Sequence, residues 1–337
     1  MSRLASSTHG RRIAGIIAIS VVSVVSVVSV GCGGRGSPEA GPVVSGSSQV
    51  ASGSATEPAS KPTGAKITCD VLPFAPSTPV PEASGAAWMT IDGKLGLVVI
   101  SDSGNDGAFA IIDPDTGDTR EQGTLPLGDR TGRGGSDDLE GVAIRDGKLV
   151  AVTSSGWIRV WERGASGFTL VDGPYALGPV DLPDKGPADR DAPGMVCSER
   201  KSNCGRDYEG LCLAPAPSGR CLGFVASKTD GTLYCVIDKG GKLAVDRSAA
   251  IPITAESGRI ADCAFSETGT LVVGSNLFER GRVYRVTGWS DPAQARVEHI
   301  GELGIGFPET IAARGDVIYR MSDTGGAPSL MAKYQCR

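Results

Sequence analysis

Acidic residues recur at matching positions of a short phrase that returns along the chain. Glu140, Glu209 and Glu309 occupy the same place in three copies, Asp262 lies one position out of register in a weaker copy, and Ser84 takes the place in the first copy. Calcium takes six to eight oxygen ligands in flexible geometry, so acids and amides that converge predict a Ca²⁺ site. Each copy is followed by an apolar run, and further polar candidates end these runs: Asp102, Ser155, Lys228, Asn276 and Asp323.

Two interpretations of the recurring glutamates stay open. In the first, Glu140, Glu209 and Glu309 bind a metal ion or another ligand, since crowded buried carboxylates without a counterion would raise one another's pKa. In the second, a Glu before Gly at a strand start accepts backbone N–H bonds from the neighbouring repeat and holds the repeats together. The stretch 102–107 does not match an EF-hand, because Gly104 replaces the second ligand, and it predicts a tight turn.

No catalytic residue can be assigned from the sequence. The pair Ser154–Ser155 lacks the G-x-S-x-G elbow of a serine nucleophile, and His299 is the single histidine after the leader. Phosphoryl chemistry at a calcium cluster would also need basic groups to hold the phosphate. The candidates for that role are scattered along the chain: Arg200, Lys228 and Arg320.

A repeating pattern of short apolar runs positions these acids. Each repeat of 45 to 70 residues contains about four runs separated by turn residues, as in 86–91, 95–100, 108–112 and 123–127, with no long helical pattern. Four strands per repeat predict an all-β fold, a single β-propeller of five blades, with six as the alternative. The phrase then begins the first strand of each blade, and alternation would send every second side chain into the central channel.

The two ends of the folded region are expected to close the ring together. The fifth repeat is one strand short, and the segment 65–74 before the first repeat has a strand pattern. Pairing of the N- and C-terminal strands would complete the last blade. A disulfide between Cys69 and Cys336 would lock this closure across a very long loop.

The region 67–337 contains eight cysteines, an even number that predicts disulfides in an exported domain. Zinc is the competing interpretation, but no Cys-x2-Cys spacing is present. One pair falls in an insert, 180–207, that interrupts the repeats and is either functional or a surface feature. The expected pairs are Cys69–Cys336, Cys197–Cys204, Cys212–Cys263 and Cys221–Cys235.

The N-terminus has the organisation of a bacterial lipoprotein. A basic start and an apolar run precede Gly31 and Cys32, which predicts a signal peptide over 1–31 and acylation of Cys32, with palmitate among the attached chains. An uncleaved anchor and plain secretion are the alternatives. Residues 32–66 are rich in Gly, Ser and Pro and predict a flexible linker to the propeller at 67–337. Gly33 after Cys32 favours the outer membrane, with the domain facing the periplasm or the surface.

The charge of the chain restricts its partners. Removal of the leader, which has three arginines and no acids, takes the formal net charge from −5 to −8. Nucleic acid and anionic membrane surfaces are therefore poor partners. The expected contacts are the lipid bilayer through the acyl anchor and an unknown small ligand or envelope protein, with the chain itself a monomer.

The repeat region resembles bacterial phytase-like or SdiA-regulated-type β-propellers. The residues that carry the resemblance are 82–85, 101–105, 138–143 and 208–212, and the stretch 139–163 is closest to the phytase side. The resemblance implies a group that includes calcium-dependent phosphatases and many proteins without an established activity. We therefore expect a membrane-anchored module that binds a ligand or a protein, and the alternative is a Ca²⁺-dependent phosphoric-ester hydrolase that uses the acidic channel.

Overall fold

The computed structural model describes residues 67–131, 134–178, 207–253 and 260–337. This part consists of β-strands, with one short 3-10 helix at Pro292–Gln294. Within these ranges no helix is long and apolar enough to cross a membrane. The predicted leader, Cys32, the linker and most of the 180–207 insert lie outside the described residues.

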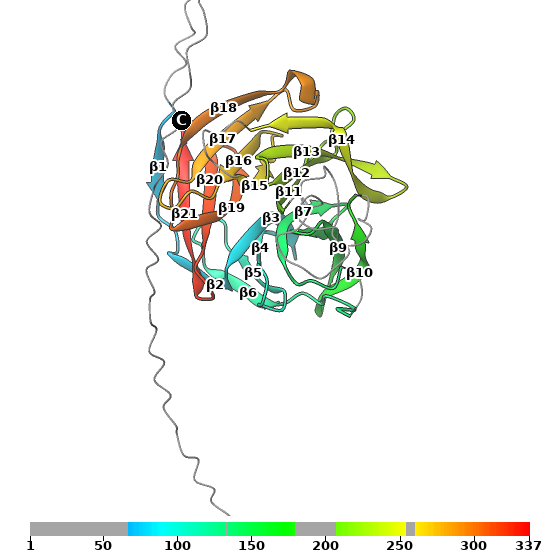
Figure 1. Cartoon of the computed structure of the whole chain (residues 1–337). Helices are drawn as coiled ribbons and strands as arrows, with labels where there is room; N and C mark the ends of the chain where they lie inside the picture. The colour runs from blue at the N-terminus through cyan, green and yellow to red at the C-terminus, as the bar shows by residue number, and fades with distance from the viewer. Residues whose placement is uncertain (1–66, 132–133, 179–206, 254–259) are drawn as a thin grey trace, which may run out of the picture. The chain divides into compact units, whose positions relative to one another are not determined.

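Five antiparallel four-stranded sheets form the blades of a propeller, so the prediction of five blades is confirmed and the alternative of six is wrong. Their first strands, β3, β7, β11, β15 and β19, gather around the centre in Figure 1 and contact one another in a closed ring. Blades 1 to 4 contain, in chain order, β3 (Ala83–Ile91), β4 (Lys94–Ser101), β5 (Ala108–Ile112), β6 (Thr119–Thr124); β7 (Leu139–Arg145), β8 (Lys148–Thr153), β9 (Trp157–Gly164), β10 (Gly167–Ala176); β11 (Tyr208–Leu213), β12 (Gly223–Ser227), β13 (Thr232–Lys239), β14 (Lys242–Pro252); and β15 (Ile260–Phe265), β16 (Leu271–Ser275), β17 (Arg282–Thr287), β18 (Arg296–Glu302).

Blade 5 takes strands from both ends of the domain. It consists of β19 (Phe307–Arg314), β20 (Val317–Asp323), β21 (Pro328–Cys336) and β1 (Cys69–Leu72), and β2 (Ser77–Pro81) also pairs with β21. In the register of β1 and β21, Cys69 lies opposite Cys336, and the two form a disulfide. Backbone hydrogen bonds of 2.8 Å in both directions between Thr68 and Arg337 extend the pairing. The ring is thus closed as the sequence predicted.

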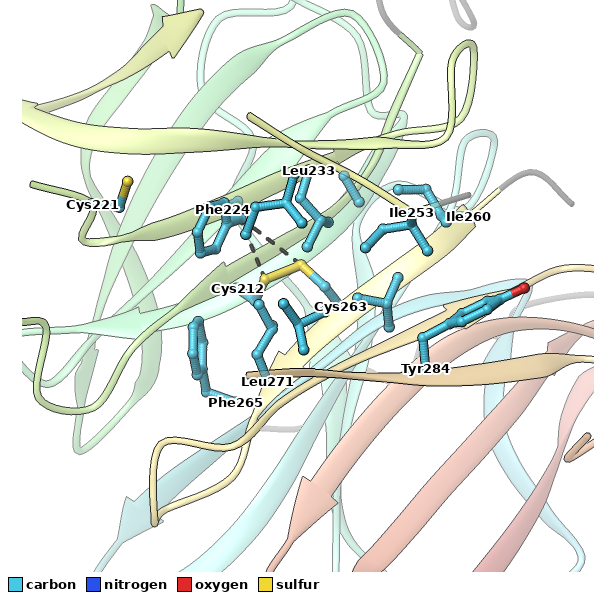
Figure 2. Packing of buried hydrophobic residues seen from close by; sticks show 14 of the residues in the cluster. Cys212, Cys221, Phe224, Leu233, Ile253, Ile260, Cys263, Phe265, Leu271 and Tyr284 are labelled. Atoms are coloured by element: carbon cyan, nitrogen blue, oxygen red, sulfur yellow. Dashed lines mark hydrogen bonds between the residues drawn. A yellow bond between two sulfur atoms is a disulfide. The ribbon is translucent and has the colours of Figure 1, made fainter. Parts of the chain in front are cut away.

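Two further disulfides lie within and between blades. Cys212 on β11 bonds Cys263 on β15, which joins the first strands of blades 3 and 4 inside a buried apolar cluster (Figure 2). Cys221 bonds Cys235 within blade 3. The expected Cys197–Cys204 pair lies outside the described residues.

The core of the domain lies between the blades and not in the channel. Along β7, Val142 and Ile144 pack in the cluster between blades 1 and 2, whereas Ala143 packs in the cluster between blades 2 and 3. A propeller sheet has a neighbouring blade on each face, so the alternation of a strand serves those two faces. The expectation that every second side chain of the first strand points into the channel is therefore wrong.

Candidate functional site

Each first strand begins with a β-bulge, and the side chain of the extra residue points to neither face of the blade. In β7, Leu139 pairs with Thr153 of β8 and Gly141 pairs with the adjacent Val152. Glu140 is therefore the extra residue. The same irregularity occurs in all five blades. The extra residues are Ser84, Glu140, Glu209, Ala261 and Glu309.

The residue after the bulge explains why glycine follows glutamate in the recurring phrase. A Cβ added to Gly141 would lie 2.0 Å from the backbone nitrogen of Leu211 in the next blade, and one added to Gly210 would lie 2.6 Å from Asp262 Oδ1. At Gly141 and Gly210 the first strands approach so closely that a side chain would displace the neighbouring strand, whereas the same position holds Asp262 in blade 4 and Thr310 in blade 5. The phrase therefore combines a packing position with a position that faces the axis.

The acids meet at the end of the channel where the first strands begin and the second strands finish, which we call the acidic end. Glu140 interacts electrostatically with Glu209, Asp102, Asp138 and Glu309, which belong to four different blades. The convergence of distant repeats around one axis thus brings the predicted residues together. They divide into two groups with different neighbours.

The first group consists of Asp102, Asp138 and Glu140. Asp102 follows the last residue of β4 in blade 1, and the other two lie at the start of β7 in blade 2. One carboxylate oxygen from each residue lies within 4.8 Å of the other two. Asp138 accepts a hydrogen bond from the hydroxyl of Ser154 and was not among the predicted site residues, although it begins the phrase that contains Glu140. Three carboxylates at this spacing form a candidate cation site.

Glu140 is the least compensated acid of this group. It is 4% exposed, and within the described part of the chain its carboxylate makes no hydrogen bond or ion pair, although it lies close enough to Lys228 for the two charges to interact. Burial raises the pKa of Glu140 well above its usual value, and the charges of Glu209 and Asp102 add to the shift. Burial also raises the pKa of Asp102 to about 7, against the backbone N–H of Ser103 that lowers it. An isolated buried carboxylate is costly, so this group favours a bound cation.

The second group already contains a cation. Lys228, at the end of β12, places its Nζ 2.8 Å from Glu209 Oε2 and 3.5 Å from Glu309 Oε1. Burial lowers the pKa of Lys228, but the two carboxylates outweigh it and hold the pKa above its usual value. Burial raises the pKa of Glu309, and Lys228 and the side chain of Asn276 oppose this rise. Two of the three glutamates predicted as metal ligands thus share one lysine as their counterion.

The remaining predicted acids lie in other environments. Asp262 is 1% exposed and accepts backbone N–H bonds from Cys263 at 2.7 Å and from Ile311 of the next blade at 3.1 Å. It therefore joins blades 4 and 5, the role that the sequence offered as the alternative for the glutamates. Asp323, opposite Phe307 at the end of β20, accepts the backbone N–H of Gly325 at 2.7 Å.

The basic groups proposed to hold a phosphate are engaged elsewhere. Lys228 contacts the two glutamates, and Arg320 is fully buried and donates to the carbonyls of Ser275 at 2.8 Å and Pro308 at 3.0 Å. Arg200 lies outside the described residues. These arrangements leave neither Lys228 nor Arg320 available to a substrate.

Two exposed aromatic side chains lie at the same end of the propeller. Phe278, in the loop after β16, is 57% exposed, and Phe307, at the start of β19, is 50% exposed. Their ring centroids are 5.0 Å apart, and a backbone bond of 2.9 Å from Glu279 N to Gly306 O fixes the two loops together. Sequence reasoning missed this pair, because no motif surrounds either residue.

The known proteins that this chain resembles are solved structures. No family model matches the chain, and no curated protein matches its sequence. Similar solved structures are β-propellers. The PQQ-bound aldose sugar dehydrogenase of Streptomyces coelicolor is 18% identical over 81% of this chain and 99% of its own, with a TM-score of 0.44. A gluconolactonase of Xanthomonas campestris is 14% identical over 77% and 88%, with a TM-score of 0.42. The calcium-binding protein regucalcin of Agrobacterium tumefaciens is 14% identical over 79% and 96%, with a TM-score of 0.41. Similarities this low carry no information about activity.

Proposed function

We propose that this protein is a ligand-binding module of the cell envelope that holds Ca²⁺ at the acidic end of its propeller. Asp102, Asp138 and Glu140 are the residues that would bind the ion. The observation that carries the proposal is the Glu140 carboxylate, which is buried beside two other acids and makes no ion pair or hydrogen bond within the described residues, while the nearby Lys228 contacts two other glutamates. A divalent ion supplies the missing positive charge, and carboxylate oxygens are the ligands that calcium prefers.

The ion also suggests how a ligand would bind. Three carboxylates supply only part of the six to eight oxygen ligands of calcium, so water or ligand oxygens would fill the remaining positions. Phe278 and Phe307 offer an apolar surface at the same end of the propeller. This combination suits a small molecule that has oxygen donors on one side and an apolar face on the other.

The envelope location rests on separate observations. The lipoprotein-like leader and Cys32 predict an acyl anchor in the outer membrane. Three disulfides in the described domain are consistent with an oxidising compartment, where such bonds persist. Both observations support an extracytoplasmic domain.

Hydrolysis of phosphoric esters is the rival activity, favoured by the acidic cluster and by the phytase-like resemblance. It requires cationic groups around the phosphate as well as calcium. Lys228 and Arg320 do not serve, because one is bound to glutamates and the other is buried. The rival predicts release of phosphate from phytate or p-nitrophenyl phosphate with Ca²⁺, lost on chelation and in a folded Glu140→Gln variant.

Calcium titration of the purified protein tests the proposal. We expect Ca²⁺ to bind and to stabilise the fold, by about 2.7 kcal/mol at a hundred times the dissociation constant. Glu140→Gln should lose this stabilisation while folding normally, because the amide keeps the shape and removes the charge. Glu162→Gln is the matched control, since Glu162 is an exposed glutamate on β9 and is not one of the three proposed ligands. A melt that does not respond to Ca²⁺, or equal binding by Glu140→Gln, would overturn it.

A further inference from the structure

A second concave site lies at the other end of the channel. It is a cavity of about 740 Å³ lined by residues from all five first strands. These residues follow the bulges and extend to the far ends of the strands, whereas the acids lie at the bulges. The lining from the first strands includes Trp88, Ile144, Leu213, Phe265 and Arg314, one from each blade. We call this site the apolar cavity.

Most of the side chains in the wall of the apolar cavity are aliphatic, and Trp88 and Phe265 add two aromatic rings. Residues from the first strands are joined there by Leu222 and by two prolines that follow β11, Pro215 and Pro217. The Cys212–Cys263 disulfide contributes to the wall and ties two of the surrounding strands together (Figure 2). The wall is therefore both apolar and cross-linked, which suits a preformed pocket.

Peptide groups supply the polar component of this site. Within the described sheets each of the strands β3, β7, β11 and β15 pairs on one side only, as does β19 in the closing blade. The other edge of each strand faces the axis, and a strand edge presents backbone N–H and C=O groups. A ligand in the cavity would thus meet neutral donors and acceptors surrounded by apolar side chains.

The charges at the rim of the cavity are balanced and already paired. Arg145 forms an ion pair with Asp238, and Arg314 Nη1 lies 3.7 Å from Asp115 Oδ1. Glu267 Oε2 accepts the backbone N–H of Gly315 at 3.0 Å. A rim of this kind attracts neither anions nor cations strongly.

We infer that the apolar cavity binds an uncharged small molecule, largely apolar and with a few neutral hydrogen-bonding groups such as a carbonyl or an amide. Its volume lies in the range of small-molecule sites, about 300–1,000 Å³. The site shares no lining residue with the acidic cluster, so we expect ligand binding here not to require calcium.

Titration of the whole protein with Nile red, an uncharged ring compound with a carbonyl group, tests this inference. We expect one saturable site per chain. Leu213→Asp and Ile144→Asp place a carboxylate on the partly exposed wall and should each weaken binding at least tenfold. Val171→Asp, at a position that is 44% exposed on β10 and outside the cavity, should leave binding unchanged. Partition of the dye into the acyl anchor or detergent is common to all variants and cancels in the comparison.

Three outcomes decide the inference. Equal saturable binding by wild type and by both wall variants, with near-UV circular dichroism showing intact folds, would overturn it. Sedimentation that shows a dimer for the wild type and a monomer for Leu213→Asp would also overturn it, because the cavity would then be an interface between two copies. Binding that is unchanged by chelation and by Glu140→Gln supports a site separate from the proposed calcium site.

Discussion

Replacement of Lys228 by methionine tests whether this lysine takes the place of a metal ion between two glutamates. The change keeps most of the apolar stem and removes the charge. Lys228 contacts Glu209 at 2.8 Å and Glu309 at 3.5 Å, and Glu209 is 2% exposed. The variant therefore leaves two buried carboxylates without their cation, while one oxygen of Glu209 already has no partner among the described residues.

The magnitude follows from these distances and from burial. At an effective dielectric constant of about 20, the Coulomb attraction of Lys228 amounts to roughly 6 kcal/mol for Glu209 and roughly 5 kcal/mol for Glu309. Most of this offsets the desolvation of the three groups, and removal of one partner from a buried pair costs about 3–5 kcal/mol. We expect a loss of that size in Lys228→Met at pH 8 with a chelator. The loss should shrink at pH 5, because the pKa values of Glu209 and Glu309 are already raised by burial and rise further without the lysine.

Urea unfolding of the wild type, of Lys228→Met and of a control variant at pH 8 and pH 5 measures this effect. Lys242→Met is the matched control, since Lys242 is 55% exposed and lies 3.7 Å from Asp172, a pair expected to contribute less than about 1 kcal/mol. Added Ca²⁺ should restore part of the stability of Lys228→Met by occupying the vacated position. A loss below about 1 kcal/mol at pH 8, or an equal loss at pH 5, would refute the assignment of the lysine as a buried counterion.

Three other predictions concern the framework around the site. Cys336→Ser opens the Cys69–Cys336 closure, and the chain-entropy model for a separation of 267 residues gives a loss of about 5–6 kcal/mol, measurable as a lower urea midpoint. Burial raises the pKa of Asp262, so the folded protein keeps a proton that the unfolded chain releases near pH 3.8. The stability that this proton contributes is complete below that pH and is lost as the pH rises. The urea midpoint of Asp262→Asn should therefore fall less between pH 4 and pH 9 than that of the wild type. Gly141→Ala places a Cβ against the backbone of the next blade and should cost at least about 2 kcal/mol, whereas Gly164→Ala, with nothing closer than 3.8 Å, should change the melting temperature little.

The periodic features of this protein were predictable because they depend on spacing alone. Repeats of four apolar runs determine the blades, and the unpaired fifth repeat together with Cys69 and Cys336 determines the closure. The bulge was not predictable, since one extra residue in a strand leaves the apolar pattern on either side intact. Glu140 therefore faces the axis because it is the extra residue of the bulge, and not because of strand alternation. The apolar cavity was also invisible, because a void between strands has no residue pattern of its own.

The division of the acids shows how a symmetric ring acquires one site. The residue at the bulge position is Ser, Glu, Glu, Ala or Glu around the ring, and in blade 1 the Ser84 hydroxyl donates to the backbone carbonyl of Leu139 in blade 2 at 2.6 Å. The equivalent positions then differ in their charge environment. Lys228 contacts the glutamates of blades 3 and 5, and blade 4 has no acid at this position. Between blades 1 and 2, Asp102 and Asp138 add negative charge beside Glu140, which makes no ion pair within the described residues. The candidate cation site therefore lies to one side of the axis, because Lys228 is near blades 3 and 5 whereas Asp102 and Asp138 are near Glu140.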